Sequence, residues 1–536
     1  MNARHLSPQR RTAGPLLALA ALVALASCRT RAPLWSQSLD IAGPLAVNGE
    51  LAFLNRTTAI VTLLDPSGSK APVSVNVTHW PRAFAVAGTN VVVAGGTGAA
   101  PELDIVSVPS GDLRSLALPG AYDRAAVSPD GNLVVLDYDP SKPPAPGGPA
   151  ARNNDQLSVV DLAAGKVSTF ALRTEALAPE QIVFSPDGQV AAVVLDGAIA
   201  LVEPDNTDQR VVVPLKLPDG TVLQPVQAAF APDGAYLYVR ARGDDDVLSL
   251  EVDKSASGLT SAINFLYFPG GAGLQDILVP QGAGFTRYVA ALYTTNTVTL
   301  ALLDATGDTS KTHSTQLSQP ATTLGDLGNG QLLAYADPAL APGAPTRYLA
   351  GWEPLLDRLD QDVLSGQVAK SPLVGPGIAF FPHDVVNTSS GSTAALTAVR
   401  LEDDGSRLRL RLAPIVLGGG ASALAMDAAN GMLLVAVDVP RKDSGAAPDP
   451  NDDQNFDGDT GSLVAVNADS LSLGGATLDD TSTAVGFAGA YVWAQHSSPF
   501  GDITFVPLAH LDRAHARRVT GFLASHLTDT KEATSP

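Results

Sequence analysis

The chain has a single cysteine among its 536 residues. One thiol cannot form an internal disulfide bond, so no disulfide framework stabilises this fold. Charged residues are also scarce, at 16 %, and the excess of acidic over basic residues gives a net charge of −20. A strongly acidic chain is repelled by nucleic acid and by anionic lipid headgroups, which argues against both as electrostatic partners.

The amino terminus has the features of a secretory signal. Arg4, Arg10 and Arg11 precede an apolar stretch over residues 16–26. This stretch is shorter than the roughly 20 apolar residues that a membrane-spanning helix needs. A basic start followed by a short apolar core is typical of a signal peptide, which we place at residues 1–27.

The end of this stretch, Leu25-Ala26-Ser27-Cys28, resembles the lipobox of bacterial lipoproteins. The resemblance implies that the sulfur of Cys28 receives a diacylglycerol and that residues 28–39 form a tether between lipid and fold. More than one acyl chain gives stable membrane anchoring. In this family an Asp after the cysteine marks retention in the inner membrane, so Arg29 favours the outer membrane. The alternative is an ordinary signal peptide with a chance cysteine.

Glycine and proline are abundant, with 49 and 40 residues, so turns are frequent. The clearest unit has short apolar strands over residues 182–184, 190–195 and 198–202, with the turn Ser185-Pro186-Asp187-Gly188 after the first. Proline sets φ at the corner of such a turn, and glycine adopts a positive φ without a Cβ clash. Similar units follow one another along the chain, and about ten begin near Pro44, Arg82, Arg124, Gln181, Val226, Leu274, Ala321, Gly377, Ala421 and Ser482.

Units of four short strands at a period of roughly 40–50 residues predict an all-β fold, a β-propeller of four-stranded antiparallel blades. We place the propeller at residues 40–525 and a disordered tail at residues 526–536. Two packed β-sandwiches are the alternative, with Greek-key strands and no repeating four-strand unit. About ten units exceed the usual four to eight blades, so the chain forms either one large ring or two rings.

The turn at Ser185 to Gly188, together with aspartates that close third strands at Asp161, Asp253 and Asp304, resembles the blades of YVTN-type surface-layer and TolB-like propellers. The Gly-His and Trp-Asp pairs of WD40 repeats are absent. The resemblance therefore implies a repeat propeller of the YVTN or TolB kind.

Long segments rich in Pro, Gly and Ser fall mostly between second and third strands. They cover residues 140–155, 338–346, 387–393 and 440–461. Alternate turns of a blade emerge on opposite faces, so these four insertions are expected on one face. Their composition favours extended or flexible chain rather than helix. They form either a binding surface or tolerated surface variation.

One acidic segment has the pattern of a metal-binding loop. Asp453, Asn455, Asp457 and Asp459 alternate around Gly458, as in the first half of an oxygen-ligand calcium loop. The loop departs from an EF-hand because its twelfth position is not Glu, and its ninth position lacks the Asp found in dockerin-like loops. We expect a structural Ca²⁺ here; the alternative is a solvated acidic loop.

Catalytic patterns are missing. The sequence has no Gly-x-Ser-x-Gly motif and no complete phosphate-binding loop, and its only cysteine lies at the expected lipidation site. His79 and His383 follow or precede strands and are interpreted as ordinary core or surface histidines. His510 and His515 are five residues apart, so they do not share a helical face and do not predict zinc.

Two functions follow from these observations. The first is a lipid-anchored envelope propeller without enzymatic activity, which binds a protein or a glycan through the loops of one face. The second is a calcium-dependent propeller hydrolase, similar to lactonases or phytases, in which carboxylates and a histidine converge on the central channel. The apolar innermost strands favour the first.

Overall fold

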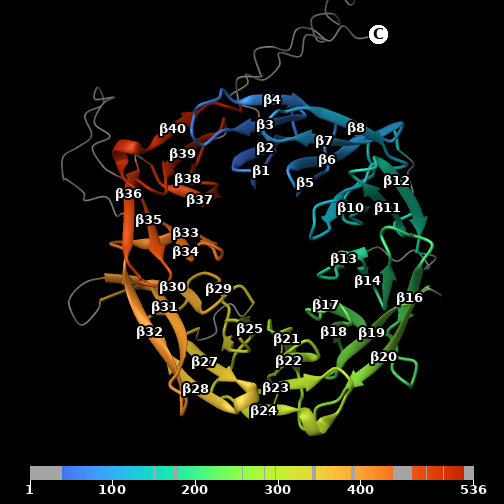
Figure 1. Ribbon diagram of the computed structural model, residues 1–536, viewed down its shortest axis with the longest axis vertical. Coiled ribbons are helices and arrows are strands. Elements are labelled where there is room, and N and C mark those ends of the chain that lie inside the picture. The colour runs from blue at the N-terminus through green and yellow to red at the C-terminus, as the bar shows by residue number, and fades with distance from the viewer. Residues whose placement is uncertain are drawn as a thin grey trace, which may run out of the picture.

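The computed structural model describes residues 39–148, 152–172, 179–255, 258–282, 284–295, 297–340, 346–387, 393–438, 461–478, 480–498 and 500–523. In this part of the chain the strands form ten four-stranded antiparallel sheets. The sheets follow one another around a single ring, from blue to red in chain order (Figure 1). The chain is therefore a ten-bladed β-propeller, which confirms the predicted fold class and shows one ring rather than two rings or packed sandwiches.

Each blade uses four consecutive strands, with the first innermost and the fourth outermost (Figure 1). The strands of the first five blades are β1 (Ile41–Val47), β2 (Glu50–Asn55), β3 (Ile60–Leu64), β4 (Val73–Asn76); β5 (Ala83–Ala87), β6 (Asn90–Thr97), β7 (Ala100–Ser107), β8 (Leu113–Ala117); β9 (Arg124–Val127), β10 (Leu133–Asp137), β11 (Gln156–Asp161), β12 (Lys166–Ala171); β13 (Pro179–Phe184), β14 (Ala191–Leu195), β15 (Ala198–Val202), β16 (Arg210–Pro214); β17 (Gln224–Phe230), β18 (Tyr236–Arg242), β19 (Val247–Ser255) and β20 (Gly258–Leu266).

The remaining five blades repeat this order. Their strands are β21 (Leu274–Leu278), β22 (Tyr288–Tyr293), β23 (Thr299–Asp304), β24 (His313–Gln316); β25 (Thr323–Asp326), β26 (Leu332–Tyr335), β27 (Tyr348–Glu353), β28 (Arg358–Val363); β29 (Leu373–Gly375), β30 (Ile378–Asn387), β31 (Thr393–Asp403), β32 (Leu408–Val416); β33 (Gly420–Asp427), β34 (Met432–Asp438), β35 (Gly461–Asn467), β36 (Leu473–Leu478); β37 (Ser482–Ala488), β38 (Tyr491–His496), β39 (Asp502–Pro507) and β40 (Arg517–Thr520). The helical elements of the described part are three short 3-10 turns, η2 (Thr309–Lys311), η3 (Pro354–Leu356) and η4 (Arg513–His515).

The unit chosen from the sequence is blade 4, and its turn has the expected geometry. Gly188 adopts a φ of +71° and its N–H donates to the carbonyl of Ser185 at 2.8 Å. The hydroxyl of Ser185 accepts from the N–H of Val190 at 2.9 Å. The same turn recurs in blade 3, where the N–H of Gly131 donates to the carbonyl of Ser128. A short serine- and glycine-bearing turn therefore sets the register between the two inner strands.

Strand alternation divides the connections between two faces of the ring. The links from second to third strand, and from one blade to the next, emerge on the face that we call the insertion face. The links from first to second and from third to fourth strand emerge on the opposite, tight-turn face. All four predicted insertions join a second strand to a third, in blades 3, 7, 8 and 9, so all four begin and end on the insertion face, as expected.

The buried apolar residues form a separate cluster at each boundary between blades. Ten clusters of buried apolar side chains lie one at each boundary between neighbouring blades, and no single core unites them. Second and third strands, such as β14 and β15, are buried along their whole length because both faces of the sheet are covered. Such strands read as continuous apolar runs instead of alternating patterns.

Arginines on the tight-turn face join neighbouring blades. Arg114 of blade 2 donates to the carbonyl of Leu162 in blade 3, and Arg400 of blade 8 donates to the carbonyl of Asp469 in blade 9 at 2.8 Å. The guanidinium of Arg517 in blade 10 donates to the carbonyl of Asp65 in blade 1 at 2.6 Å. Each such contact satisfies carbonyls in the turn between the third and fourth strands of the next blade.

Blades 10 and 1 meet without exchanging a strand, since β1 to β4 and β37 to β40 each form a complete sheet. The seam instead depends on side chains that follow the last strand. The ring of Phe522 lies 4.9 Å from that of Phe53, centroid to centroid, and both rings are buried. The N–H of Leu523 donates to the carbonyl of Phe500 at 3.0 Å, which holds this segment against blade 10.

We predict that Phe522→Ala weakens the seam. Truncating a buried phenylalanine costs about 3–5 kcal/mol, and here the loss falls on the boundary that closes the ring. The measurement is urea unfolding, with Leu473→Ala as the control, because Leu473 is apolar but 49 % exposed. Equal loss of stability in the two variants would contradict the proposed role of Phe522.

Candidate functional site

The site residues predicted from the sequence lie outside the described residues. These are the lipobox and the acidic loop, namely Leu25, Ala26, Ser27, Cys28, Asp453, Asn455, Asp457 and Asp459. In the sequence, the acidic loop falls between β34 and β35, whose facing ends, Asp438 and Gly461, lie on the insertion face. Among the residues that the structure describes, no group of three or more His, Cys, Asp and Glu side chains could hold a metal ion. No helix of the described part is long and apolar enough to cross a membrane.

Exposed apolar side chains gather on the insertion face. In the described part of the chain, most exposed large apolar residues lie in connections on the insertion face or at the strand ends next to these connections. Both exposed aromatic residues of the described part are among them. These residues are Trp80, Val222, Val226, Tyr267, Leu340, Val363 and Val416. Aromatic side chains are enriched at protein interfaces, so the two exposed aromatic residues favour this face over the tight-turn face as a binding surface.

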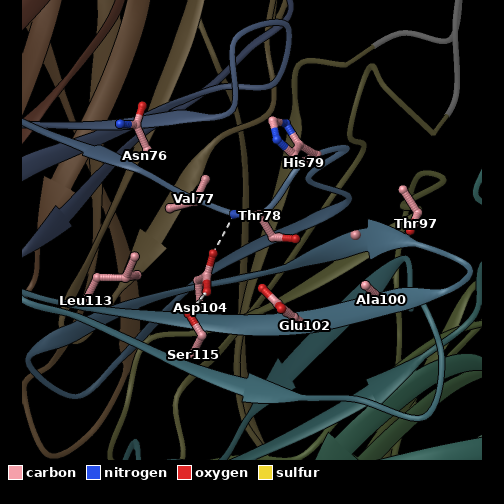
Figure 2. Close-up of a pocket in the computed structure, with 11 residues that line it drawn as sticks. Asn76, Val77, Thr78, His79, Thr97, Ala100, Glu102, Asp104, Leu113 and Ser115 are labelled. Carbon is pink, nitrogen blue, oxygen red and sulfur yellow. Dashed lines mark hydrogen bonds between the residues drawn. The ribbon is translucent and has the colours of Figure 1, made fainter. Parts of the chain in front are cut away.

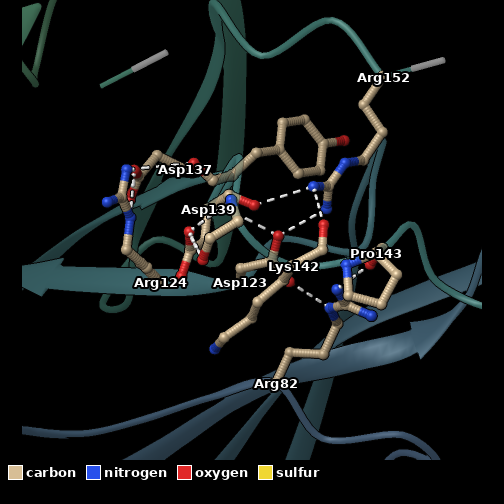
Figure 3. Close-up of polar contacts among 10 residues, drawn as sticks. Arg82, Asp123, Arg124, Asp137, Asp139, Lys142, Pro143 and Arg152 are labelled. Atoms are coloured by element: carbon tan, nitrogen blue, oxygen red, sulfur yellow. Dashed lines mark hydrogen bonds and ion pairs between the residues drawn. The ribbon is translucent and has the colours of Figure 1, made fainter. Parts of the chain in front are cut away.

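A buried ion cluster fixes the insertion of blade 3 (Figure 3). The carboxylate of Asp123 is fully buried and pairs with two guanidinium groups, that of Arg82 and, at 2.6 Å, that of Arg152. It also accepts from the backbone N–H of Asp139 at 3.1 Å. Arg152 donates in turn to the carbonyls of Asp139 and Lys142, at 2.9 and 2.6 Å. The two arginines that pair with Asp123 therefore also satisfy backbone carbonyls in the first turn of the insertion.

A second ion pair extends this cluster toward blade 4. Arg124 pairs with Asp137 and donates to the carbonyls of Pro179 and Glu180 at the start of the next blade. Burial raises the pKa of Asp137 to about 6, although Arg124 favours its charged form. The desolvation of this carboxylate thus outweighs its attraction to the guanidinium, as is common for buried pairs.

The fixed insertion rests on the neighbouring blade. The N–H of Gly98, in the turn between β6 and β7 of blade 2, donates to the carbonyl of Pro146 at 2.9 Å. A Cβ atom at Gly98 would lie 2.0 Å from the Cα of Gly148, so glycine is required for this close approach. The insertion of blade 3 therefore packs against the turn between β6 and β7 of blade 2.

An open cavity of about 380 Å³ lies between blades 1 and 2 beside this turn (Figure 2). Its base is ordered by Asp104, which is 1 % exposed. The carboxylate of Asp104 accepts from the backbone N–H of Thr78 and from the hydroxyl of Ser115. The lining contains no lysine or arginine. The cavity size falls within the range of about 300–1,000 Å³ for small-molecule sites.

Several polar side chains around this cavity have no hydrogen-bond partner in the described part of the chain. They come from the outer strand of blade 1, the link to blade 2, and the second and third strands of blade 2, and they are Asn76, Thr78, His79, Thr97 and Glu102. Their donors and acceptors are available to a ligand. Sequence reasoning treated His79 as an ordinary histidine, because nothing in the sequence shows that strands of two blades converge around it.

The other histidines have different surroundings. His383 is buried, with Nε2 at 2.9 Å from the hydroxyl of Thr397 and Nδ1 at 2.8 Å from the carbonyl of Asp384. It is the satisfied core histidine that the sequence predicts. The rings of His510 and His515 stack with centroids 4.7 Å apart on the outside of blade 10.

A second cavity, of about 480 Å³, opens on the insertion face between blades 5 and 6. It is lined by Arg240, Arg242, Asp244 and Asp245 among others. Asp245 accepts from the N–H of Gly273 at 2.7 Å, and Arg240 donates to the amide oxygen of Gln227 at 3.1 Å. Burial lowers the pKa of Arg240. Its charged groups are of both signs, so the cavity has no clear preference for a ligand charge.

The innermost strands carry few charged groups. Arg124, Glu180, Asp276, Asp326 and Asp427 belong to five different blades, and no histidine lies on any innermost strand. The carboxylate of Asp276 is occupied by the N–H of Leu324 at 2.8 Å, and that of Asp326 by the N–H of Gln281 at 2.7 Å. These groups link neighbouring blades, and the innermost strands do not bring carboxylates and a histidine together.

No protein-family model and no curated protein matches this sequence. Several solved structures are similar to it at low sequence identity. The chain is similar to dihydro-heme d1 dehydrogenase NirN in complex with DHE, at 13 % identity and a TM-score of 0.42 over 95 % of this chain and 85 % of that one. It is similar to a eukaryotic initiation factor, at 12 % identity and a TM-score of 0.44 over 83 % and 97 %, and to BamB from Moraxella catarrhalis, at 13 % identity and a TM-score of 0.33 over 65 % and 94 %. These similarities concern the propeller fold alone.

Proposed function

We propose that this protein is a lipid-anchored propeller of the bacterial cell envelope, placed on the outer membrane, that binds an envelope protein or glycan through its insertion face. One observation carries the proposal. In the described part of the chain, the insertion face combines the ends of all four long insertions, both exposed aromatic residues and the opening of the cavity between blades 5 and 6. Variable loops on a rigid scaffold are where binding residues concentrate.

The calcium-dependent hydrolase is the less favoured function. It needs carboxylates and a histidine that converge on the channel, whereas the innermost strands hold isolated charged groups in five blades. On the tight-turn face, the guanidinium groups of Arg114, Arg400 and Arg517 already donate to backbone carbonyls of the next blade. A binding role uses the insertion face without any of these groups.

We predict that charges placed on the insertion face abolish partner binding. Leu340→Glu and Val416→Glu alter residues that are 61 % and 44 % exposed on that face. A buried carboxylate without a partner is costly at an interface, so each variant should capture at most a tenth of the wild-type amount of partner. The measurement is capture of labelled envelope components by the immobilised protein.

The matched controls are Leu355→Glu and Leu473→Glu, which lie on the tight-turn face and are 42 % and 49 % exposed. They should bind as the wild type does. If the tight-turn variants lose binding and the insertion-face variants keep it, the proposed binding face is wrong.

We predict that Cys28→Ala leaves the protein without its lipid. An acylated chain partitions into a detergent-rich phase, because each buried methylene contributes about 0.8 kcal/mol. The wild type should therefore move to the detergent phase and the variant to the aqueous phase. Equal partitioning of both forms into the aqueous phase would refute the anchor.

We propose that the acidic loop binds calcium with a structural role, through Asp453, Asn455, Asp457 and Asp459. Calcium loops of extracellular modules bind with Kd values of about 10⁻⁴–10⁻³ M, so millimolar calcium should stabilise the protein by about 1 kcal/mol. Asp457→Ala should remove this effect and leave the calcium-free melting temperature nearly unchanged. The measurement is thermal melting with calcium, magnesium or chelator; no calcium-dependent shift in the wild type would identify a solvated acidic loop.

A further inference from the structure

The link between blades 1 and 2 contains a residue in an unfavourable conformation. Trp80 adopts a φ of +58°, in the left-handed region that disfavours a bulky side chain. The residue is also 59 % exposed, so burial does not explain the conformation. Strained residues that the surrounding structure holds in place concentrate at functional sites.

The surrounding structure holds this link firmly. The carboxylate of Asp104 accepts from the N–H of Thr78, and the N–H of Gly96 donates to the carbonyl of His79 at 2.7 Å. A Cβ atom at Gly95 would lie 2.7 Å from the carbonyl oxygen of Trp80, so glycine allows β6 to approach the link closely. The exposed indole is therefore presented by a rigid backbone.

Trp80 directly follows His79, which lines the cavity between blades 1 and 2, and consecutive Cα atoms are about 3.8 Å apart. Trp80 therefore adjoins the lining of a cavity whose free groups are hydroxyls, an amide, an imidazole and the carboxylate of Glu102; Figure 2 shows these lining residues. A flat apolar surface beside many small donors and acceptors matches a sugar ring, which has apolar C–H faces and hydroxyls around its edge.

The negative charge of the lining and of the whole chain disfavours acidic sugars as ligands. The cavity has Glu102 and Asp104 and no basic residue in its lining, and the whole chain carries a net charge of −20. An acidic sugar would be repelled both by the lining and by the field of the whole protein. The chemistry fits a neutral saccharide.

We propose that the cavity between blades 1 and 2, with Trp80 at its side, binds a neutral saccharide chain. This inference rests on the proposed envelope-binding function and specifies one ligand class for the insertion-face side of blades 1 and 2. Trp80 supplies the stacking surface. Glu102, Asn76 and Thr97 supply hydrogen bonds to hydroxyls, and Asp104 acts as a positioning residue that fixes the Thr78–Trp80 link.

The test is titration of the full mature chain with chitohexaose, cellohexaose and maltohexaose, followed by tryptophan fluorescence. Trp352 and Trp493 are 0 % and 8 % exposed, so Trp80 dominates the accessible signal among the described tryptophans. At least one of the three probes should quench the fluorescence saturably. An oligogalacturonate of the same length should bind at least tenfold more weakly.

Variants separate binding from folding. Trp80→Gly removes the ring and suits the positive φ, because glycine adopts it freely. The melting temperature should stay equal or rise while the affinity, measured by calorimetry, falls at least tenfold. Glu102→Ala should also lose about tenfold, and Glu102→Gln should recover part of the affinity because its amide oxygen still accepts from a hydroxyl.

The matched control is Asn329→Gly, which relieves another positive φ, of +52°, in an exposed turn on the tight-turn face of blade 7. It should leave the affinity within twofold of the wild type. The proposal is overturned if none of the neutral probes binds, if Trp80→Gly and Glu102→Ala bind as the wild type does, or if the acidic probe binds more tightly. Envelope capture that persists in Trp80→Gly when no saccharide binds would refute this inference alone and leave the proposed function standing.

Discussion

The structure depends on apolar packing between neighbouring blades. A single four-stranded sheet leaves two apolar faces in water, so each blade is stable only when both faces are covered. The ten clusters of buried side chains meet this need in turn, and the tenth, between blades 10 and 1, closes the ring. No strand is exchanged between blades 10 and 1. The ring is closed there by side-chain contacts, which include the Phe53–Phe522 ring contact and the hydrogen bond from Arg517 to the carbonyl of Asp65.

The packing between blades affects the connections on the two faces of the ring differently. On the tight-turn face, short turns pack against those of the preceding blade, and a Cβ atom at Gly131 would lie 2.3 Å from the backbone N of Gly88. On the same face, arginine side chains such as Arg114 and Arg400 donate to turn carbonyls of the next blade. The long segments between second and third strands begin and end on the insertion face. The ion pairs of Asp123 with Arg82 and Arg152 fix one of these segments to blades 2 and 3. The candidate binding features accordingly lie on the face where the insertions begin and end.

The repeating unit was predictable because its signals are local. Ser185 to Gly188 forms the expected turn, and Arg124, Leu274 and Ser482 are the first residues of innermost strands, as the repeat pattern indicates. Gly377 was a less accurate starting point, since β29 ends before it at Gly375. The number of rings was not predictable, because closure depends on packing between residues such as Phe53 and Phe522 that are far apart in sequence. The cavity beside His79 and the strain at Trp80 likewise arise from contacts between blades, which no local pattern records.

The most direct test of the binding face is site-specific photo-crosslinking in intact envelopes. A photoreactive amino acid replaces Tyr267 or Val363 on the insertion face and Leu356 or Asn329 on the tight-turn face; all four positions are exposed. We expect adducts with an envelope protein or glycan from the first two positions and none from the others. Adducts confined to the tight-turn positions would show that the insertion face is not the binding face.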